Sequence, residues 1–281
     1  MLDLTCIAPT AAQVLGVRPP RHAEGEALAD LASDLGGCAR LAIVILDGLG
    51  MATWRAAQEH TPVLNQAAGR HLLQLRSVSP PVTPVCLATI ATGARPQTHG
   101  VLEREDPFKA ETIFEVMREA GRTSGVAGGA TCSAARVLGR WSDITRRVGP
   151  EGEGREDLIL TAGLRIIEDD QPDLFLTQFL AVDSASHKYG PFTPEAAEAA
   201  RSLDSRFGRL LEDLRERGYG VLALADHGQH PIDPPVKGKR GWHDGSAEED
   251  MIVPLVWVGP TSVPSPRRGG AATGRPRGPG T

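Results

Sequence analysis

The chain has 281 residues, of which 41% are hydrophobic and 23% are charged, and it carries a formal net charge of -5 with a pI near 5.9. This acidic balance excludes a general positive field for capturing nucleic acid or an anionic membrane, so any phosphate affinity must come from a local site. The four cysteines are scattered and form no C-x-x-C pair, which argues against a disulfide framework and against a thiolate metal site. With no signal-like or membrane-spanning apolar segment, we expect a cytoplasmic protein without membrane or stable nucleic-acid partners.

Alternating strand and helix patterns predict an α/β fold with a doubly wound, mostly parallel sheet and helices on both faces. Short apolar runs that resemble strands buried on both faces occupy residues 41–46, 174–180 and 221–225. Helical periodicity marks roughly residues 109–120, 156–168 and 194–217. We therefore predict an N-terminal segment over 1–39 that packs onto one catalytic domain over 40–260, followed by a disordered Gly-, Pro- and Arg-rich tail over 261–281.

An aspartate follows each predicted strand closely, at Asp47, Asp183 and Asp226. Ligands of doubly wound sheets bind at the carboxyl ends of the strands, so these three distant residues can converge on one crevice. Taken singly, each aspartate is more simply explained as a turn or capping residue. Taken together with His187, His227 and His243, they supply the oxygen and nitrogen ligands that a pair of catalytic divalent metals requires.

Thr83 stands before Pro84 and an apolar run that ends at Gly93, a pattern that predicts a helix with Thr83 as its N-cap. A hydroxyl there meets the positive end of the helix dipole, where an incoming phosphate is favoured, and a metal can lower its pKa enough to make it a nucleophile. The alternative is an ordinary N-cap threonine.

Residues 83–100 read TPVCLATIATGARPQTHG. This stretch resembles the T-x-P-N and T-G-x-x-P-x-x-H-G motifs of the type I phosphodiesterase and nucleotide pyrophosphatase branch of the alkaline phosphatase superfamily, and the resemblance spans most of residues 41–260. It implies an alkaline phosphatase-like fold with Thr83 as the nucleophile. It also implies two metal positions, the first formed by Asp47, Thr83, Asp226 and His227, and the second by Asp183, His187 and His243.

The resemblance implies a two-metal phosphodiesterase or nucleotide pyrophosphatase that acts on a small phosphorylated substrate through a phosphothreonine intermediate. Zinc is the expected ion at both positions, and manganese is the alternative because all the ligands are nitrogen and oxygen. A phosphomonoesterase, a mutase or a phosphonate hydrolase of the same superfamily shares this metal set. The competing interpretation outside enzymes is a non-catalytic metal-binding relic of the fold, and a homo-oligomer is left open.

Some positions depart from the family pattern. The motif proline comes one place early, at Pro84, and the family's phosphate-binding Asn is replaced by Cys86. Arg104 is a candidate substitute as a bidentate phosphate donor, with a loop arginine paired to neighbouring acids as the alternative. Trp242 is a candidate platform for stacking on a leaving group, or else it borders the core.

The segment over residues 6–17, CIAPTAAQVLGV, resembles a D-x-x-P-T-x-x-x-L-L-G-I element that closes this domain in the family. Here it comes first in the chain, with Cys6 in place of the aspartate. We hypothesise a circular permutation in which this N-terminal helix packs beside the final strand near residues 253–258.

Overall fold

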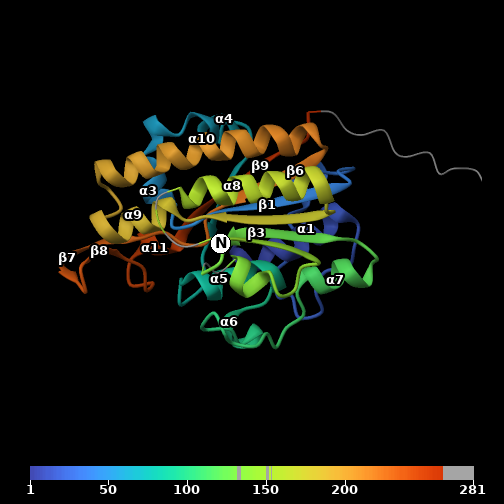
Figure 1. Cartoon of the computed structure of the whole chain (residues 1–281). Helices are drawn as coiled ribbons and strands as arrows, with labels where there is room; N and C mark the ends of the chain where they lie inside the picture. Colours follow the sequence, from blue (N-terminus) through green and yellow to red (C-terminus); the bar gives the residue numbers. More distant parts are fainter. Residues whose placement is uncertain (132–133, 150–151, 153, 262–281) are drawn as a thin grey trace, which may run out of the picture.

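The computed structural model describes residues 1–131, 134–149, 152 and 154–261. Its centre is a seven-stranded sheet in the order β2-β9-β6-β1-β5-β3-β4, and helices cover both faces of it (Figure 1). The strands are β1 Arg40–Leu46, β2 Leu72–Arg76, β3 Ser124–Gly129, β4 Ile144–Val148, β5 Leu174–Phe179, β6 Tyr219–Leu224 and β9 Ile252–Val258.

Parallel pairing of β6, β1, β5, β3 and β4 confirms the predicted doubly wound, mostly parallel sheet, and β9 joins β6 in the antiparallel sense. The register places Leu46 of β1 opposite Phe179 of β5, and Ile45 opposite Leu224 of β6. Because β5 and β6 are buried along their whole length and β1 along all but its first residue, apolar side chains occupy both faces of these strands instead of alternating with polar ones, and only Thr177 and Gln178 interrupt the run in β5. The carboxyl ends of these three strands therefore open at one edge of the sheet.

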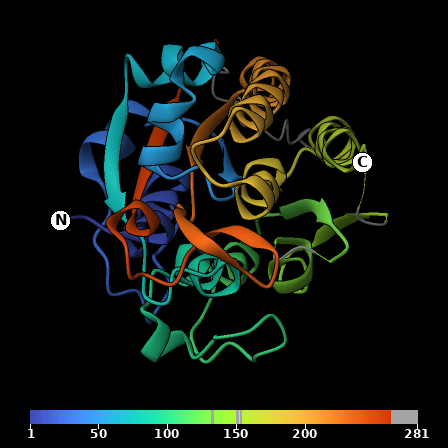
Figure 2. The same ribbon diagram turned by 90° about the vertical axis from the view of Figure 1, so that its left-hand side faces the viewer.

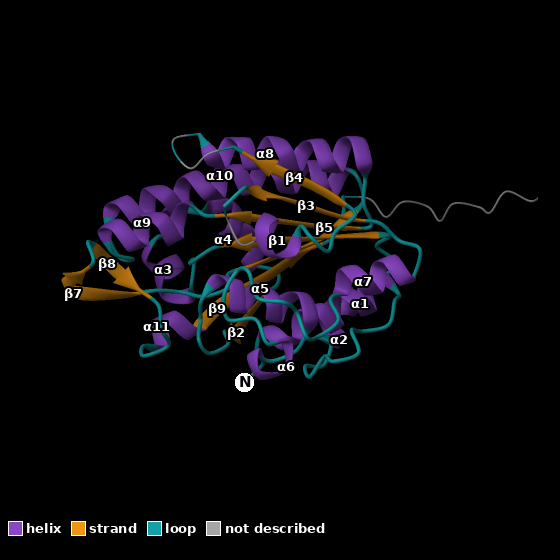
Figure 3. Ribbon diagram, turned by 60° about the horizontal axis from the view of Figure 1, so that its bottom comes forward, coloured by secondary structure: helices purple, strands orange, loops and turns teal. Residues whose placement is uncertain are grey.

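The helices form two layers. One layer consists of α4, α8 and α10, which contact strands β3, β5, β6 and β9 on one face of the sheet. The other layer, on the opposite face, consists of α1, α2, α5 and α7 (Figures 1 and 3). The bounds are α1 Ile7–Leu15, α2 Ala29–Asp34, α3 Met51–Ala56, α4 Pro62–Ala68, α5 Thr83–Thr92, α6 Pro96–His99, α7 Ile113–Glu119, α8 Arg155–Arg165, α9 Ala181–Tyr189, α10 Pro194–Glu216 and α11 Glu248–Met251. Short 3-10 turns cover Leu4–Cys6 and Gln58–His60, and π turns cover Ala134–Leu138 and Ile166–Asp170. No described helix combines the length and apolar character needed to cross a membrane.

A separate two-stranded hairpin, β7 His230–Val236 with β8 Lys239–Trp242, projects from the end of the sheet where the parallel strands finish (Figures 2 and 3). It packs against α9, so it stands beside the crevice that the strand ends form.

Capping explains where the observed helices differ from the predicted ones. Helix α7 begins at Ile113 instead of near residue 109, because Thr112 and Glu115 form a reciprocal capping box that fixes its start. Helix α10 begins just after its Thr193 cap, close to the prediction. Thr83, however, is the first residue of α5 and not its N-cap, since Val82 holds the extended cap position and Thr83 forms no capping hydrogen bond.

The N-terminal segment is integrated with the sheet. Leu4, Ile7 and Ala8 are fully buried, Asp3 bridges to Arg76 of β2, and α1 packs on β1, α2 and α5. This packing is necessary for the proposed circular permutation, but it does not test the ancestral chain order, so the permutation stays a hypothesis. The predicted disordered tail falls almost entirely on residues 262–281, which lie outside the described residues.

His99, the last residue of α6, is fully buried, and its ring makes two hydrogen bonds. Its Nδ1 accepts from the Val101 N–H at 3.1 Å, so its Nε2–H faces the Thr89 hydroxyl at 3.0 Å. This arrangement has no place for a second ring proton, and burial lowers the pKa of His99 from 6.5 to about 4.

Because the folded pKa of His99 lies below the unfolded value, the unfolded chain binds the proton first as the pH falls. The stability that neutral His99 supplies above pH 6.5 is therefore lost progressively towards pH 4. We expect His99→Asn, which keeps an acceptor for Val101 but does not titrate, to lose less free energy of unfolding between pH 7.5 and pH 5 than the wild type does. Urea unfolding of both proteins in a chelator measures this, and equal losses would contradict the assignment.

Candidate metal centre

The predicted ligands come from the carboxyl ends of the three central strands. Asp47 follows β1, Asp226 and His227 follow β6, and Asp183 lies in the first turn of α9, directly after β5. The start of α9 is fixed by Glu156 of α8, whose carboxylate accepts from the Leu180 N–H at 3.1 Å. These segments meet at the edge of the sheet that faces the viewer in Figure 2.

Asp183, His187 and His243, the second predicted ligand set, converge closely. His187 Nε2 lies 3.5 Å from Asp183 Oδ1 and 3.2 Å from His243 Nε2, and His243 Nε2 lies 3.8 Å from Asp183 Oδ1. A tetrahedral zinc with bonds of about 2.0–2.1 Å separates its ligand atoms by about 3.3 Å. The three atoms therefore form one face of a suitable coordination polyhedron.

The first predicted set is arranged around His227. Its Nε2 lies 3.5 Å from Asp47 Oδ1, 3.6 Å from Asp226 Oδ2 and 3.2 Å from Thr83 Oγ1. These separations again match the edges of a four-coordinate metal site. Thr83 thus faces the ligand cluster from the first turn of α5.

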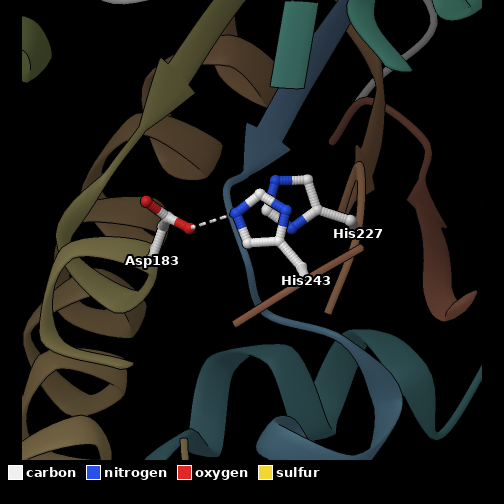
Figure 4. A group of neighbouring side chains, drawn as sticks. All are labelled: Asp183, His227 and His243. Carbon is white, nitrogen blue, oxygen red and sulfur yellow. Dashed lines mark ion pairs between the residues drawn. The ribbon is translucent and has the colours of Figure 1, made fainter. Parts of the chain in front are cut away.

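The two positions adjoin through their histidines. The rings of His227 and His243 stack with their centroids 3.9 Å apart and an interplanar angle of 16°. In Figure 4 both imidazoles face the Asp183 carboxylate, and each of these three residues offers one ligand atom within 4.8 Å of the others. His227 is therefore close enough to serve either position, although the sequence assigned it only to the first.

Backbone carbonyls fix the tautomer of all three histidines. A carbonyl oxygen can only accept, so each Nδ1 that faces one carries a proton, which leaves the lone pair on Nε2. The contacts are His187 to Gly241 O at 2.9 Å, His227 to Gly228 O at 3.1 Å and His243 to Pro81 O at 2.8 Å. All three Nε2 lone pairs consequently point into the centre in the form that binds metal.

The carboxylate oxygens and the imidazole Nε2 atoms, all of them hydrogen-bond acceptors, thus face one another in a buried space. Asp226 Oδ2 accepts no hydrogen bond among the described residues, and burial, followed by the charge of Asp183, raises the pKa of Asp226 to about 7. Burial and the neighbouring His227 lower the pKa of His243 to about 4. Positive charge at the centre would lower the raised pKa of Asp226, and it is compatible with the lowered pKa of His243, which keeps that imidazole neutral. The residues present therefore fit a pair of divalent cations.

The other singled-out residues lie around this centre. Trp242 ends β8 with its ring edge-on to His187, at a centroid distance of 6.2 Å, and Lys239 Nζ lies 5.0 Å from the Trp242 centroid. Arg104 lies in an exposed turn beyond α6, and its predicted phosphate contact stays a prediction. Cys86 is fully buried against the Ser77 hydroxyl, and burial raises the pKa of its thiol, which is consistent with a packing residue.

Two buried glutamines that contact the ligands were missed from the sequence. Gln178 donates to Asp47, and Gln229 donates to Asp183. The available signal was a single amide inside the apolar run of β5, and a second one directly after Asp-His-Gly.

Asp250 is also buried, and it lies at the centre of a third cluster of acidic and imidazole groups, formed with His230 and Asp244. One of its oxygens lies 2.8 Å from His230 Nδ1, and the other accepts from the N–H groups of Asp244 and Gly245 at 3.1 and 3.0 Å. These bonds hold the loop that follows His243, so this cluster has a structural role in the described chain. The His230 side chain is only 15% exposed in this pairing.

A doubly wound sheet thus carries two adjoining oxygen and nitrogen ligand sets beyond its strand ends, the arrangement that a two-metal centre requires. The family model described as type I phosphodiesterase / nucleotide pyrophosphatase matches residues 41–254. The chain belongs to this family.

Known proteins similar to this chain include venom phosphodiesterase CdcPDE of Crotalus durissus collilineatus, which is 26% identical over 192 residues, or 59% of this chain and 23% of that protein. The chain spans less than a quarter of the length of such curated relatives. Among solved structures, human ectonucleotide pyrophosphatase / phosphodiesterase 5 gives a TM-score of 0.62 at 14% identity, over 79% of this chain and 88% of that one. Phosphonoacetate hydrolase from Sinorhizobium meliloti gives 0.56 at 24% identity, over 68% and 57%.

Proposed function

We propose that this chain is a metal-dependent phosphodiester hydrolase with Thr83 as its nucleophile. The observation that carries the proposal is the position of Thr83 Oγ1 at the N-terminus of α5, 3.2 Å from His227 Nε2 of the first predicted ligand set. Zinc is the proposed ion at both positions, with manganese as the alternative. When bound, the ions supply positive charge that activates the hydroxyl and neutralises the charge that develops on the phosphoryl oxygens.

In the proposed reaction, the Thr83 hydroxyl loses its proton and Oγ1 forms a bond to phosphorus while the bond from phosphorus to the leaving oxygen breaks, and a proton from solvent replaces the lost one on that oxygen. The oxygen of a water molecule then bonds to phosphorus, the bond from phosphorus to Thr83 Oγ1 breaks, and a proton from this water restores the Thr83 hydroxyl. The first turn of α5 contributes here because its backbone N–H groups and dipole favour an anionic phosphoryl group at this end of the helix. The three carbonyl-bound histidines keep the centre rigid, so little reorganisation is needed when substrate arrives.

The diester preference rests on the family match and is tested with paired chromogenic esters. Purified protein with added zinc or manganese should hydrolyse bis(p-nitrophenyl) phosphate with a higher kcat/KM than p-nitrophenyl phosphate. A higher kcat/KM for the monoester would replace the diesterase assignment by a phosphomonoesterase. Absence of turnover on both esters, with two metal ions demonstrably bound, would support the non-catalytic alternative.

Arg104 and Trp242 are proposed to contact the phosphoryl group and the leaving group of the substrate, respectively. Trp242 is supported by its position next to His187. Location in the cytoplasm and a small phosphorylated substrate are part of the proposal, and they rest on the scattered cysteines and on the family match.

A further inference from the structure

Gln178 is a fully buried amide on β5 with both ends of its side chain engaged. Its Nε2 donates to Asp47 Oδ2 at 2.6 Å, and its Oε1 accepts from the Ala134 N–H at 2.9 Å. The Ala134 bond settles which end of the amide faces Asp47, because an N–H group requires the oxygen. The other oxygen of Asp47, Oδ1, is the one that lies 3.5 Å from His227 Nε2.

Gln229 lies beside the second ligand set, and it too is fully buried. It contacts Oδ1 of Asp183, the same oxygen that faces both histidines of that set and whose second lone pair stays available. Its Nε2 donates to Asp183 Oδ1 at 2.6 Å and to the Asp183 carbonyl oxygen at 3.2 Å. Both acceptors belong to one residue, so the amide spans the backbone and the carboxylate of Asp183 and restricts the rotation of its side chain. Gly241 packs beside it, and a Cβ there would clash first with the Ser186 carbonyl oxygen and then with Gln229 Oε1, at 2.6 Å.

We propose that Gln178 and Gln229 are positioning residues, one for each metal position, that orient the Asp47 and Asp183 carboxylates for metal binding. The inference rests on the proposed function, since it takes both aspartates as ligands. A neutral amide suits this task better than a lysine or arginine, because it donates a hydrogen bond without placing a positive charge that competes with the cation. Backbone carbonyls fix the histidines in the same way, and backbone N–H groups hold Asp226. Asp47 and Asp183 are therefore the two ligands whose carboxylates accept from a buried side-chain amide.

The inference makes a site-selective prediction about metal affinity. Gln178→Met keeps the size of the side chain but removes its donor, and it should weaken metal binding at the Asp47 position by about 10–100-fold. Gln229→Met should weaken the Asp183 position by a similar factor. Thr177→Val is the matched control, because Thr177 neighbours Gln178 on the same buried strand and its hydroxyl has no hydrogen-bond partner among the described residues.

The measurement is zinc affinity from competition with a chelating dye, made in backgrounds where one position has been disabled. With Asp183→Asn, the remaining site should respond to Gln178→Met and not to Gln229→Met. With Asp47→Asn, the affinity of the remaining site should respond to Gln229→Met and not to Gln178→Met. Thr177→Val should change neither affinity.

The outcomes separate this inference from the proposed function. Wild-type protein that fails to bind two divalent ions would overturn the proposed function itself. Two bound ions whose affinities respond equally to both glutamine changes, or to neither, would overturn only the positioning role. Circular dichroism of the metal-free variants checks the fold, and Gln178→Leu, which is uncharged and also lacks the donor, replaces the Met variant if that protein unfolds.

Discussion

Replacing Thr83 by alanine is expected to lower kcat for bis(p-nitrophenyl) phosphate by on the order of 10³-fold or more, because the reaction then lacks the oxygen that attacks phosphorus. The fold should survive, since α5 has no side-chain capping bond and, among the described residues, the Thr83 hydroxyl is hydrogen-bonded to His227 Nε2 at 3.2 Å. Five of the six aspartate and histidine ligands keep all of their contacts, and only His227 loses its threonine neighbour. Initial rates at saturating zinc, with metal content measured on the same samples, test this expectation.

Thr83→Ser is the matched control because it keeps the nucleophilic oxygen and removes only a methyl group. It should retain diesterase activity to within about tenfold. An alanine variant that keeps its wild-type rate while binding two metal ions would exclude Thr83 as the nucleophile and leave a direct attack by water. A phosphorylated Thr83 detected by mass spectrometry after rapid acid quenching would identify the intermediate, and it should be missing from the alanine variant.

The sheet was predictable because its central strands are buried on both faces, which produces continuous apolar runs that are easy to recognise. The edge strand β2 and the hairpin strands β7 and β8 carry no comparable run, since they are partly or largely exposed. Helix starts were the least predictable feature of the fold. Helix α7 begins where the Thr112 and Glu115 capping box is satisfied, a local contact that outweighs the longer periodic pattern.

The sequence identified residues that the structure brings together at this centre, but it did not identify their hydrogen-bond partners. The motif spacings led to all six aspartate and histidine positions, and the structure brings their ligand atoms together with Thr83. The backbone oxygens that fix the imidazoles carry no signal in the amino-acid sequence, because every residue has a carbonyl. Gln178 and Gln229 have a weak signal as amides beside apolar or motif residues, but which ligand each one contacts depends on tertiary packing.

Asp226→Asn is expected to separate stability from function. Asp226 Oδ1 accepts from the N–H groups of Gly48 and His227 at 3.3 and 3.1 Å, and an asparagine oxygen can keep both bonds. The change removes the buried negative charge at Oδ2, which no described donor satisfies, so the metal-free variant should unfold at a temperature at least as high as that of the metal-free wild type. It should also lose a metal ligand, and kcat/KM should fall by more than the roughly 100-fold that loss of a ligand's hydrogen-bonded partner can cause.

Asp204 provides the matched control because it is an equally buried aspartate with a different environment. Its two oxygens accept from the N–H groups of Val63 and Leu64 at 3.0 and 2.9 Å, and it lies on α10, outside both ligand sets. Asp204→Asn must turn an amide NH₂ towards one of these donors, so the same substitution should lower the melting temperature, by about 2–4 °C for each kcal/mol lost, and leave metal affinity unchanged. Opposite signs of the two stability changes would show that the charge at Asp226 is held for metal binding at a cost to the metal-free fold. A metal-free Asp226→Asn protein that is clearly less stable than the wild type would instead assign Asp226 a structural role like that of Asp204.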